Sequence, residues 1–557
     1  MTRYGSIPVV TNAHEAVAFL ETADESISIE HERQNRRRTP LLLLAAFALG
    51  CVAYIVVPSA SWTTAYMMMH GTPYHRKRHL LDNKLDGKEM WYPHQSVDQL
   101  DPKDHRTWSH RFYKVSKHFQ GPGHPIFVVI SGEDDLDSLL YPFIEEGMAS
   151  KFGAFVIEPE HRFYGKSRPL KHESVAKYSH YLSPDQALLD LVQLVQATRM
   201  ELGCSLSRTS PKYCPVITVG GSYPGYLSAM ARFLFPDYID MSYASSAPVQ
   251  LYSQNVDAYS YYDKVSDVAE AMSPGCRDAS RRLLDELRET VLNSDWSVHQ
   301  AAEKLGYCSH TLPSYFHDLE TLVEEGVVYI VPAIFAEFNM FSYPPGPKTQ
   351  NARVCEIFKN ESLTAFEKFH GFFSIRGGLV KRKDGSSCFD MMSEMPAGKH
   401  SRLMGSDWSG TGEGRTGLIW EFQCCTDLVI RTGYSNASMF YPREFSYEWL
   451  EDHCAARFPG FHWNPMRLQN EWNFDQMEGA SNIVFTNGMN DGWAVTGSFL
   501  HDLSDTVLAI NIEDGAHHSD LGPKYPNVDD TVAVKNAQEQ VMDILDKWLN
   551  EIKAGQV

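Results

Sequence analysis

The sequence predicts an α/β fold with an inserted helical region and a single membrane-spanning helix near the N-terminus. Short β-branched runs alternate with helical patterns between residues 126 and 244, and two further runs follow between residues 482 and 512. From about 250 to 470 the strand signals fade and helical patterns dominate. An uninterrupted apolar run of 17 residues covers Leu41 to Val57. These observations predict the fold class.

The first 60 residues predict a type II membrane anchor. Residues 1–39 are polar and are expected to form a disordered cytoplasmic tail. Residues 40–60 are expected to form the anchor, because 17 apolar residues span roughly 25 Å as a helix, which is just enough to cross a bilayer. Four arginines precede the run and Trp62 follows it. The basic side should stay cytoplasmic, which leaves the rest of the chain lumenal or extracellular. The alternative is a signal peptide cleaved after Ala60, giving a secreted protein.

The remaining chain divides into a core in two parts and an insertion. The first part of the core covers residues 85–250, the mainly helical insertion 251–470, and the second part of the core 471–557. The expected strands are 126–130, 154–158, 216–219, 239–244, 482–486 and 507–512. The expected helices include 183–202, 226–235, 279–292, 296–305 and 532–552.

Residues 216–225 have the form of a nucleophile elbow. The apolar run VITV ends at a glycine pair, presents Ser222, and continues through Pro224 and Gly225 into a helical pattern. A serine on such a strand-to-helix turn projects its hydroxyl above the sheet edge, which is typical of a serine hydrolase. The usual pattern is G-x-S-x-G, and here the second glycine is displaced by one position. A glycine-rich turn that only lets the helix approach the strand is the structural alternative.

Two later strands supply partners for this serine in the order nucleophile, acid, base. Asp491 lies in the loop after residues 482–486, and His517 and His518 follow residues 507–512. A serine hydroxyl becomes a good nucleophile when an imidazole takes its proton, and a carboxylate must hold that imidazole in the correct tautomer. The pattern therefore predicts a Ser-Asp-His triad on an α/β-hydrolase core. A turn-forming aspartate and surface or metal-binding histidines are the alternatives.

With these motifs the chain resembles the serine peptidase family that includes lysosomal Pro-Xaa carboxypeptidase, dipeptidyl peptidase II and thymus-specific serine protease. The matching segments are residues 95–98 (QSVD), 107–112 (TWSHRF), 160–167 (EHRFYGKS), 182–188 (LSPDQAL), 220–225 (GGSYPG), 244–249 (ASSAPV), 420–427 (WEFQCCTD), the Asp491 loop and 515–518 (GAHH). The set in this order is specific, although most members are weak alone. The resemblance implies that Ser222 is the nucleophile, Asp491 the acid and His517 the base, with His518 a neighbour.

The resemblance further implies an α/β-hydrolase core with a helical cap domain inserted between the nucleophile strand and the acid strand. Such a cap would close over the catalytic face and limit entry to short peptides. The implied function is that of a serine exopeptidase that cleaves short peptides after proline through an acyl-enzyme, without a cofactor or metal. A lipase or esterase on the same fold and a catalytically silent surface protein remain alternatives.

Several substitutions within the matching motifs concern the substrate pocket. Family members usually have Asp-Pro-Trp where this chain has Gly492 between Asp491 and Trp493. Trp493 is retained, and a flat aromatic face suits a pyrrolidine ring, so we expect an apolar pocket that prefers proline. Tyr226 occupies a position that is often methionine in the carboxypeptidase branch and is a second candidate for the pocket. A core residue that packs the acid loop is the alternative for Trp493.

Other residues are candidates for the oxyanion hole and for the end of the substrate. The backbone N–H of Tyr223 should be one oxyanion donor, and the loop with Gly132 and Glu133 should supply the second. Release of dipeptides needs an acid such as Asp427 or Glu133 to hold an ammonium, whereas carboxypeptidase action needs a cation or donors for a carboxylate. The residues leave these two actions open.

Composition and charge restrict the class of protein. The chain has 557 residues, which is more than one hydrophobic core usually contains. Its hydrophobic content of 43% excludes a largely disordered protein. The net charge of −20 argues against a nucleic-acid partner. Peptide substrates, the membrane and a possible homodimer are the expected partners. A lysosome or vacuole, another endomembrane compartment and the cell surface are all compatible locations.

The cysteines and two sequons indicate an oxidising compartment. Nine cysteines follow the apolar run without a convincing zinc spacing, so disulfides are expected. Connectivity cannot be deduced, but Cys204 with Cys214 and Cys425 with Cys454 are short-range candidates. The odd number leaves one cysteine over, and the family pattern implies that it is Cys424. Glycosylation sequons begin at Asn360 and Asn436.

Overall fold

The computed structural model describes residues 87–312, 316–377, 379–382, 385–390, 414–497, 499–522 and 525–555. It confirms a mixed α/β architecture built on one eight-stranded sheet with the order β1-β2-β4-β3-β5-β6-β9-β10. Five parallel pairings connect β4, β3, β5, β6, β9 and β10, whereas β2 is antiparallel to both β1 and β4. The parallel part brings the carboxyl ends of its strands to one edge of the sheet.

The strands lie close to where the β-branched runs predicted them. The bounds are β1 Lys88–Ser96, β2 Thr107–Val115, β3 Ile126–Val129, β4 Phe155–Pro159, β5 Val216–Gly221, β6 Met241–Ser245, β9 Ile483–Gly488 and β10 Val507–Ile512. The sequence analysis did not predict β1 and β2, which form the antiparallel end of the sheet.

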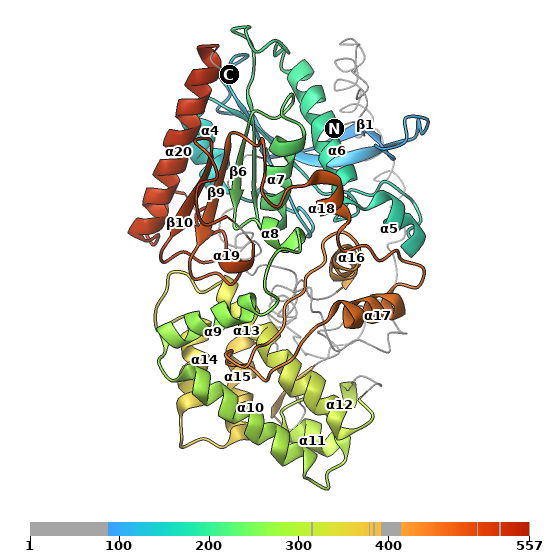
Figure 1. Ribbon diagram of the computed structural model, residues 1–557, viewed down its shortest axis with the longest axis vertical. Coiled ribbons are helices and arrows are strands. Elements are labelled where there is room, and N and C mark those ends of the chain that lie inside the picture. Colours follow the sequence, from blue (N-terminus) through green and yellow to red (C-terminus); the bar gives the residue numbers. More distant parts are fainter. Residues whose placement is uncertain are drawn as a thin grey trace, which may run out of the picture.

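Helices cover both faces of the sheet because alternate residues of each strand point to opposite sides. Ile126 and Val128 of β3 pack into one hydrophobic cluster with α6 (Pro184–Glu201) and α7 (Tyr223–Leu234). Phe127 and Val129 pack into another with α20 (Val532–Lys553). Figure 1 shows α20 along one side of the sheet and α6 and α7 along the other. The nucleophile motif therefore joins a fully buried strand to a buried helix.

The chain between β6 and β9 is mostly helical. Its elements are α8 Val249–Tyr252, α9 Ser260–Met272, α10 Cys276–Leu292, α11 Val298–Lys304, α12 Leu319–Val323, α13 Ile330–Met340, α14 Gln350–Lys359, α15 Ala365–Arg376, the short hairpin β7 Leu379–Lys381 and β8 Ser387–Phe389, α16 Gly414–Cys424, α17 Tyr447–Arg457 and α18 Arg467–Trp472. Helices α9 to α15 gather below the sheet around their own hydrophobic cluster (Figure 1).

The smaller elements complete the architecture. They are α4 Ala149–Phe152, α5 Val175–Tyr181, α19 Trp493–Thr496, π-helical turns at Phe143–Met148 and Glu324–Tyr329, and a 3-10 turn at Ser309–Thr311. The anchor expected at residues 40–60 and the tail before it lie outside the described residues. Within the part of the chain that is described, no helix combines the length and the apolar character that crossing a bilayer requires.

Four disulfides connect the described cysteines in pairs. Both predicted pairs, Cys204 with Cys214 and Cys425 with Cys454, are bonded. The other two bonds hold the helical insertion together and are Cys276–Cys355, between α10 and α14, and Cys308–Cys388. Cys424 is buried and lies outside these four bonds, as the family pattern implied. The bonded cysteines agree with the expected oxidising compartment.

Candidate active site

The elbow around Ser222 is a strained turn at the carboxyl end of β5. Ser222 has φ 63° and ψ −132°, a backbone conformation that non-glycine residues rarely adopt. Its N–H donates to the carbonyl of Ser245 at 2.9 Å, and its own carbonyl accepts from the N–H of Tyr226 at 3.0 Å. The turn is thus anchored both to the neighbouring strand β6 and to the first turn of α7. Ser222 itself is half-buried, so its hydroxyl lies where the core meets solvent.

Asp491 and His517 are joined by a hydrogen bond at the same edge of the sheet. The loop after β9 holds Asp491, and the loop after β10 holds His517, whose Nδ1 lies 2.6 Å from Oδ2 of Asp491. Asp491 is fully buried and its other oxygen, Oδ1, accepts the N–H of Trp493 at 3.0 Å. With Nδ1 occupied by the carboxylate, Nε2 is the ring nitrogen left for proton exchange.

The elbow after β5, the turn after β6 and the loop with His517 and His518 contact one another at the sheet edge. Gly221 lies so close to the ring of His518 that an added Cβ would come within 2.9 Å of it. The N–H of His518 donates to Oγ of Ser246 at 2.9 Å, and the rings of His517 and His518 lie 4.6 Å apart. Ser246 and His518 also have positive φ angles, of 47° and 36°. Strained backbone therefore clusters around the predicted triad, which is typical of functional sites.

Asp520 connects the strands below these loops. Its buried carboxylate accepts the hydroxyls of Tyr243, Ser245 and Thr486, the last two at 2.7 and 2.6 Å. Two of these hydroxyls come from β6 and the third from β9, while Asp520 itself lies three residues after His517. The Asp520 carboxylate thus connects the loop with His517 to β6 and β9. The Ser245 carbonyl of β6 binds the Ser222 N–H, and β9 leads into the Asp491 loop.

A buried hydrogen-bond chain fixes Tyr223, the residue after Ser222. Nδ1 of His161 lies 2.8 Å from the carbonyl of Arg162, which assigns the proton to Nδ1, so Nε2 accepts from the Tyr223 hydroxyl at 3.0 Å. Burial lowers the pKa of His161 to about 4, which keeps the ring neutral for this role. Gln423 donates to the Tyr223 oxygen at 3.3 Å and accepts the Tyr164 hydroxyl at 2.6 Å. Since Gln423 belongs to α16, the chain connects the insertion to the start of α7.

The loop after β3 lies against the start of α7, as the oxyanion prediction requires. A Cβ added to Gly132 would meet the ring of Pro224 at 2.6 Å. Glu133 is half-buried, and the partial loss of water around its carboxyl raises its pKa to about 7. The hydrogen bond from its own N–H and the nearby His517 lower the pKa, but by less. Glu133 is therefore an acid close to His517 that is largely protonated in an acidic compartment.

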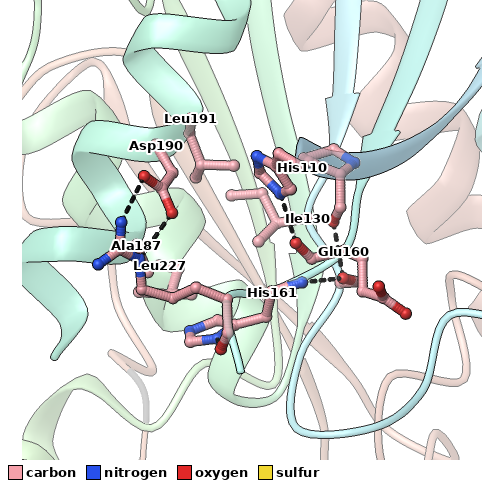
Figure 2. A pocket seen from close by; sticks show the side chains of 11 residues that line it. His110, Ile130, Glu160, His161, Ala187, Asp190, Leu191 and Leu227 are labelled. Carbon is pink, nitrogen blue, oxygen red and sulfur yellow. Dashed lines mark hydrogen bonds and ion pairs between the residues drawn. The ribbon is translucent and has the colours of Figure 1, made fainter. Parts of the chain in front are cut away.

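A small buried cavity lies behind this loop, inside the core (Figure 2). Apolar and polar residues line it together, and Arg162 among the polar ones already binds Asp190 with two contacts of 2.7 Å. The Ser131 hydroxyl donates to the carbonyl of Pro159 at 2.7 Å and accepts the N–H of His161 at 3.1 Å. These bonds fix Ser131, the first residue of the loop that is expected to complete the oxyanion hole. The start of this loop is therefore held in place by hydrogen bonds to the core.

Two of the three predicted pocket residues have an aromatic environment. Trp493 is half-buried and its ring centroid lies 4.3 Å from that of Tyr261, which comes from α9. Gly492 permits this contact, because an added Cβ would lie 2.6 Å from the Tyr261 ring. Tyr226, by contrast, is fully buried in the core, where it packs edge-on against Tyr252 and Phe474. Trp493 therefore has surface to offer a ligand and Tyr226 has none.

Asp427, the third predicted pocket residue, already has a cationic partner. Its carboxylate contacts Arg467 at 2.6 Å, and Arg467 also pairs with Asp185 at 2.7 Å and Glu471 at 3.0 Å. Burial raises the pKa of the Asp427 carboxyl, and Arg467 opposes this shift. An ammonium group of a substrate would have to compete with Arg467. Glu133 is then the more accessible of the two predicted acids.

The end of α13 contacts both the acid loop and the base loop. The amide of Asn339 donates to the carbonyl of Asn490 at 2.9 Å and accepts the N–H of Gly492 at 2.7 Å. The next carbonyl, that of Met340, accepts the N–H of His517 at 3.3 Å. Sequence reasoning missed Asn339; its available signal was a single amide near the end of a mostly apolar helix. Asp520 was missed too, although it lies beside the histidine pair.

The predicted glycosylation sites lie at the surface. Asn360 ends α14 and Asn436 lies in a turn, and both residues are exposed. Oδ1 of Asn360 accepts the hydroxyl of Ser362 at 2.7 Å, the contact expected within a sequon of this conformation. Glycosylation of both stays a prediction.

Comparisons with known proteins identify the family of the chain. The family model for serine carboxypeptidase S28 matches residues 95–541. Lysosomal Pro-X carboxypeptidase of Mus musculus is 24% identical over 527 residues, covering 90% of this chain and 98% of the relative. Thymus-specific serine protease of Mus musculus is 26% identical over 484 residues, covering 84% of this chain and 89% of the relative.

Among solved structures, proline iminopeptidase of Mycobacterium smegmatis matches with a TM-score of 0.33 and 10% identity. The match covers 84% of this chain and all of that protein. The family match includes the segments that hold Ser222, Asp491 and His517. The chain belongs to the serine carboxypeptidase S28 family and is a serine-type exopeptidase.

Proposed function

We propose that Ser222, His517 and Asp491 are the catalytic triad of this peptidase. The Ser222 hydroxyl attacks the scissile carbonyl while Nε2 of His517 takes its proton, and the same nitrogen then protonates the leaving amine. Water resolves the resulting ester by the reverse sequence of proton transfers. The observation that carries this proposal is the 2.6 Å contact between Nδ1 of His517 and Asp491, at the sheet edge where Ser222 occupies a strained elbow.

The oxyanion of the tetrahedral intermediate would be held by backbone donors. The N–H of Tyr223 is the first, because it follows the nucleophile at the start of α7. The second would come from the loop with Gly132 and Glu133, which lies against Pro224. Support for Tyr223 is the hydrogen-bond chain through His161 and Gln423, which holds the side chain of this residue in one orientation.

The substrate would be a short peptide cleaved after proline at its carboxyl end. Trp493 and Tyr261 offer an aromatic surface that suits a pyrrolidine ring, and several relatives are named Pro-X carboxypeptidases. Asp427 is paired with Arg467, so one of the two acids expected to hold an ammonium is occupied. A protonated Glu133 can instead donate a hydrogen bond to a terminal carboxylate, which would repel an ionised acid.

Two measurements test this function. A fluorophosphonate should label the wild-type protein and leave Ser222→Ala unlabelled; absence of label on the intact wild type would contradict the triad. Mass spectrometry of the products of a peptide with proline at both its second and its penultimate positions should show loss of the carboxyl-terminal residue. Release of an amino-terminal dipeptide, or faster turnover of nitrophenyl esters than of any proline peptide, would contradict the proposed specificity.

The catalytic part would lie in the lumen of an endomembrane compartment or outside the cell. The four disulfides, the exposed sequons and the lysosomal names of several relatives support this location. The apolar run from Leu41 to Val57 would be the type II anchor. A tag placed before residue 1 distinguishes anchor from cleaved leader: it stays with a carbonate-washed membrane pellet in the first case and separates from the enzyme in the second. The homodimer stays a prediction.

A further inference from the structure

We propose that Asn339, from the helical insertion, is a positioning residue for the catalytic acid. This inference rests on the proposed role of Asp491 and concerns what holds that residue in place. The Asn339 amide binds the peptide groups on both sides of Asp491, through the carbonyl of Asn490 at 2.9 Å and the N–H of Gly492 at 2.7 Å. Asn339 is fully buried, so these bonds form without competition from water.

The two bonds restrict the backbone rotation that would move the acid. Asp491 Oδ2 must stay 2.6 Å from Nδ1 of His517, and a misplacement of about 1 Å at a reacting centre can cost about 100-fold in rate. An asparagine suits this task because its carboxamide offers one donor and one acceptor in a single plane. The neighbouring Met340 carbonyl binds the N–H of His517, so the end of α13 holds the acid and its partner together.

The residue after the acid supplies one of the two bonds to Asn339. Gly492 donates its N–H to the Asn339 amide oxygen at 2.7 Å, and a proline at this position would have no N–H to donate. Gly492 has φ −58°, which a proline could adopt, so backbone conformation alone does not require glycine here. The absence of a side chain admits Tyr261, and the N–H that glycine retains supplies the bond to Asn339. In this chain the insertion therefore takes part in orienting the acid.

The matched control is Asn351, a second buried asparagine of the insertion. It lies in α14, is as buried as Asn339, and neither polar atom of its amide has a hydrogen-bond partner among the described residues. Asn351→Ala thus removes the same group from the same helical region without touching either triad loop. The effect of the cavity that truncation leaves should appear in both variants, whereas only Asn339→Ala removes hydrogen bonds to the Asp491 loop.

The experiment measures kcat, KM and the rate of fluorophosphonate labelling on the full chain. Asn339→Ala should lower kcat and the labelling rate about 10- to 100-fold with KM changed less than 2-fold, whereas Asn351→Ala should keep both rates within 2-fold of wild type. Asn339→Asp, which keeps the size but lacks the N–H donor, should lose at least about 10-fold and serves if the alanine variant does not fold. Wild-type labelling by either Asn339 variant overturns the proposal.

A double-variant cycle separates positioning from a general structural effect. If Asn339 acts through the acid, adding Asn339→Ala to Asp491→Asn should change the residual rate less than 2-fold, because the orientation of a lost carboxylate no longer matters. A full additional loss in that background overturns the proposal. Labelling of Ser222→Ala would overturn the triad and this inference together, whereas wild-type behaviour of Asn339→Ala with an unlabelled Ser222→Ala overturns this inference alone.

Discussion

Replacing Asp520 by asparagine should slow acylation as well as destabilise the fold. The carboxylate accepts three buried hydroxyls, from Tyr243, Ser245 and Thr486. A hydrogen bond to a charged acceptor contributes about 1.5–3 kcal/mol and a neutral one about 0.5–1.5 kcal/mol, so three bonds lose about 3 kcal/mol together. An amide costs less to bury than a carboxylate, which returns part of this loss. We expect a net loss of about 1–3 kcal/mol of unfolding free energy.

The same change should loosen the loop that carries His517, because Asp520 lies three residues after it. The fluorophosphonate labelling rate should fall about 10-fold at a temperature where the variant is fully folded. Urea unfolding and labelling are measured on the same samples. Asp240→Asn is the matched control: its buried carboxylate accepts Tyr213 and Arg199 just before β6, at the opposite end of the strand from the site.

Asp240→Asn should therefore lose comparable stability and label at the wild-type rate. The reasoning is refuted if Asp520→Asn labels as fast as the wild type, or if both variants lose labelling in proportion to their loss of stability. The first result would mean that the loop holds its place without the three hydroxyl bonds. The second would mean that labelling only reports how much protein is folded.

Three further results are expected. We expect kcat/KM of the wild type, divided by that of Glu133→Gln, to fall as pH rises through about 7. Below this pKa the Glu133 carboxyl is neutral and can donate to a substrate carboxylate, and above it the ionised carboxylate repels that group. A ratio that rises with pH would instead indicate recognition of an amine. Trp493→Ala should lower kcat/KM for proline substrates about 10- to 100-fold and reduce the preference for proline over alanine, which unchanged selectivity would contradict. Removing the Cys276–Cys355 disulfide should lower the unfolding free energy, measured in urea, by about 4–5 kcal/mol, because this bond closes a loop of 79 residues. The Cys204–Cys214 bond closes only 10 residues and should contribute about 3 kcal/mol, so an equal loss from the two bonds would contradict the loop-entropy account.

The central strands could be predicted because they are buried on both faces. Such strands read as short continuous apolar runs, and β5 (Val216–Gly221), which is buried throughout, covers the predicted residues 216–219. The antiparallel end of the sheet has no such signal. β1 contains charged residues and a proline, and its side chains are mostly exposed or half-buried, so neither an apolar run nor strict alternation marks it.

The candidate triad could be predicted because order along the chain and position after a strand are local properties. The supporting residues could not be found in this way. Asn339 meets the Asp491 loop across 151 residues, and Tyr164 meets Gln423 across 259. Such partners depend on how the helical insertion packs against the core, which no local pattern encodes. Asp427 was predicted from the sequence as an acid for a substrate ammonium, but its ion-pair partner Arg467 could be identified only from the structure.

The division of the site between two distant parts of the chain has a consequence during synthesis. Ser222 is translated long before Asp491 and His517, with the whole helical insertion between them. A nascent polypeptide that has emerged only as far as α18 therefore carries the hydroxyl without the groups that activate it. A ribosome-bound intermediate of this kind lacks the proposed acid and base, so under the proposed mechanism hydrolytic competence would arise only when the last strands join the sheet.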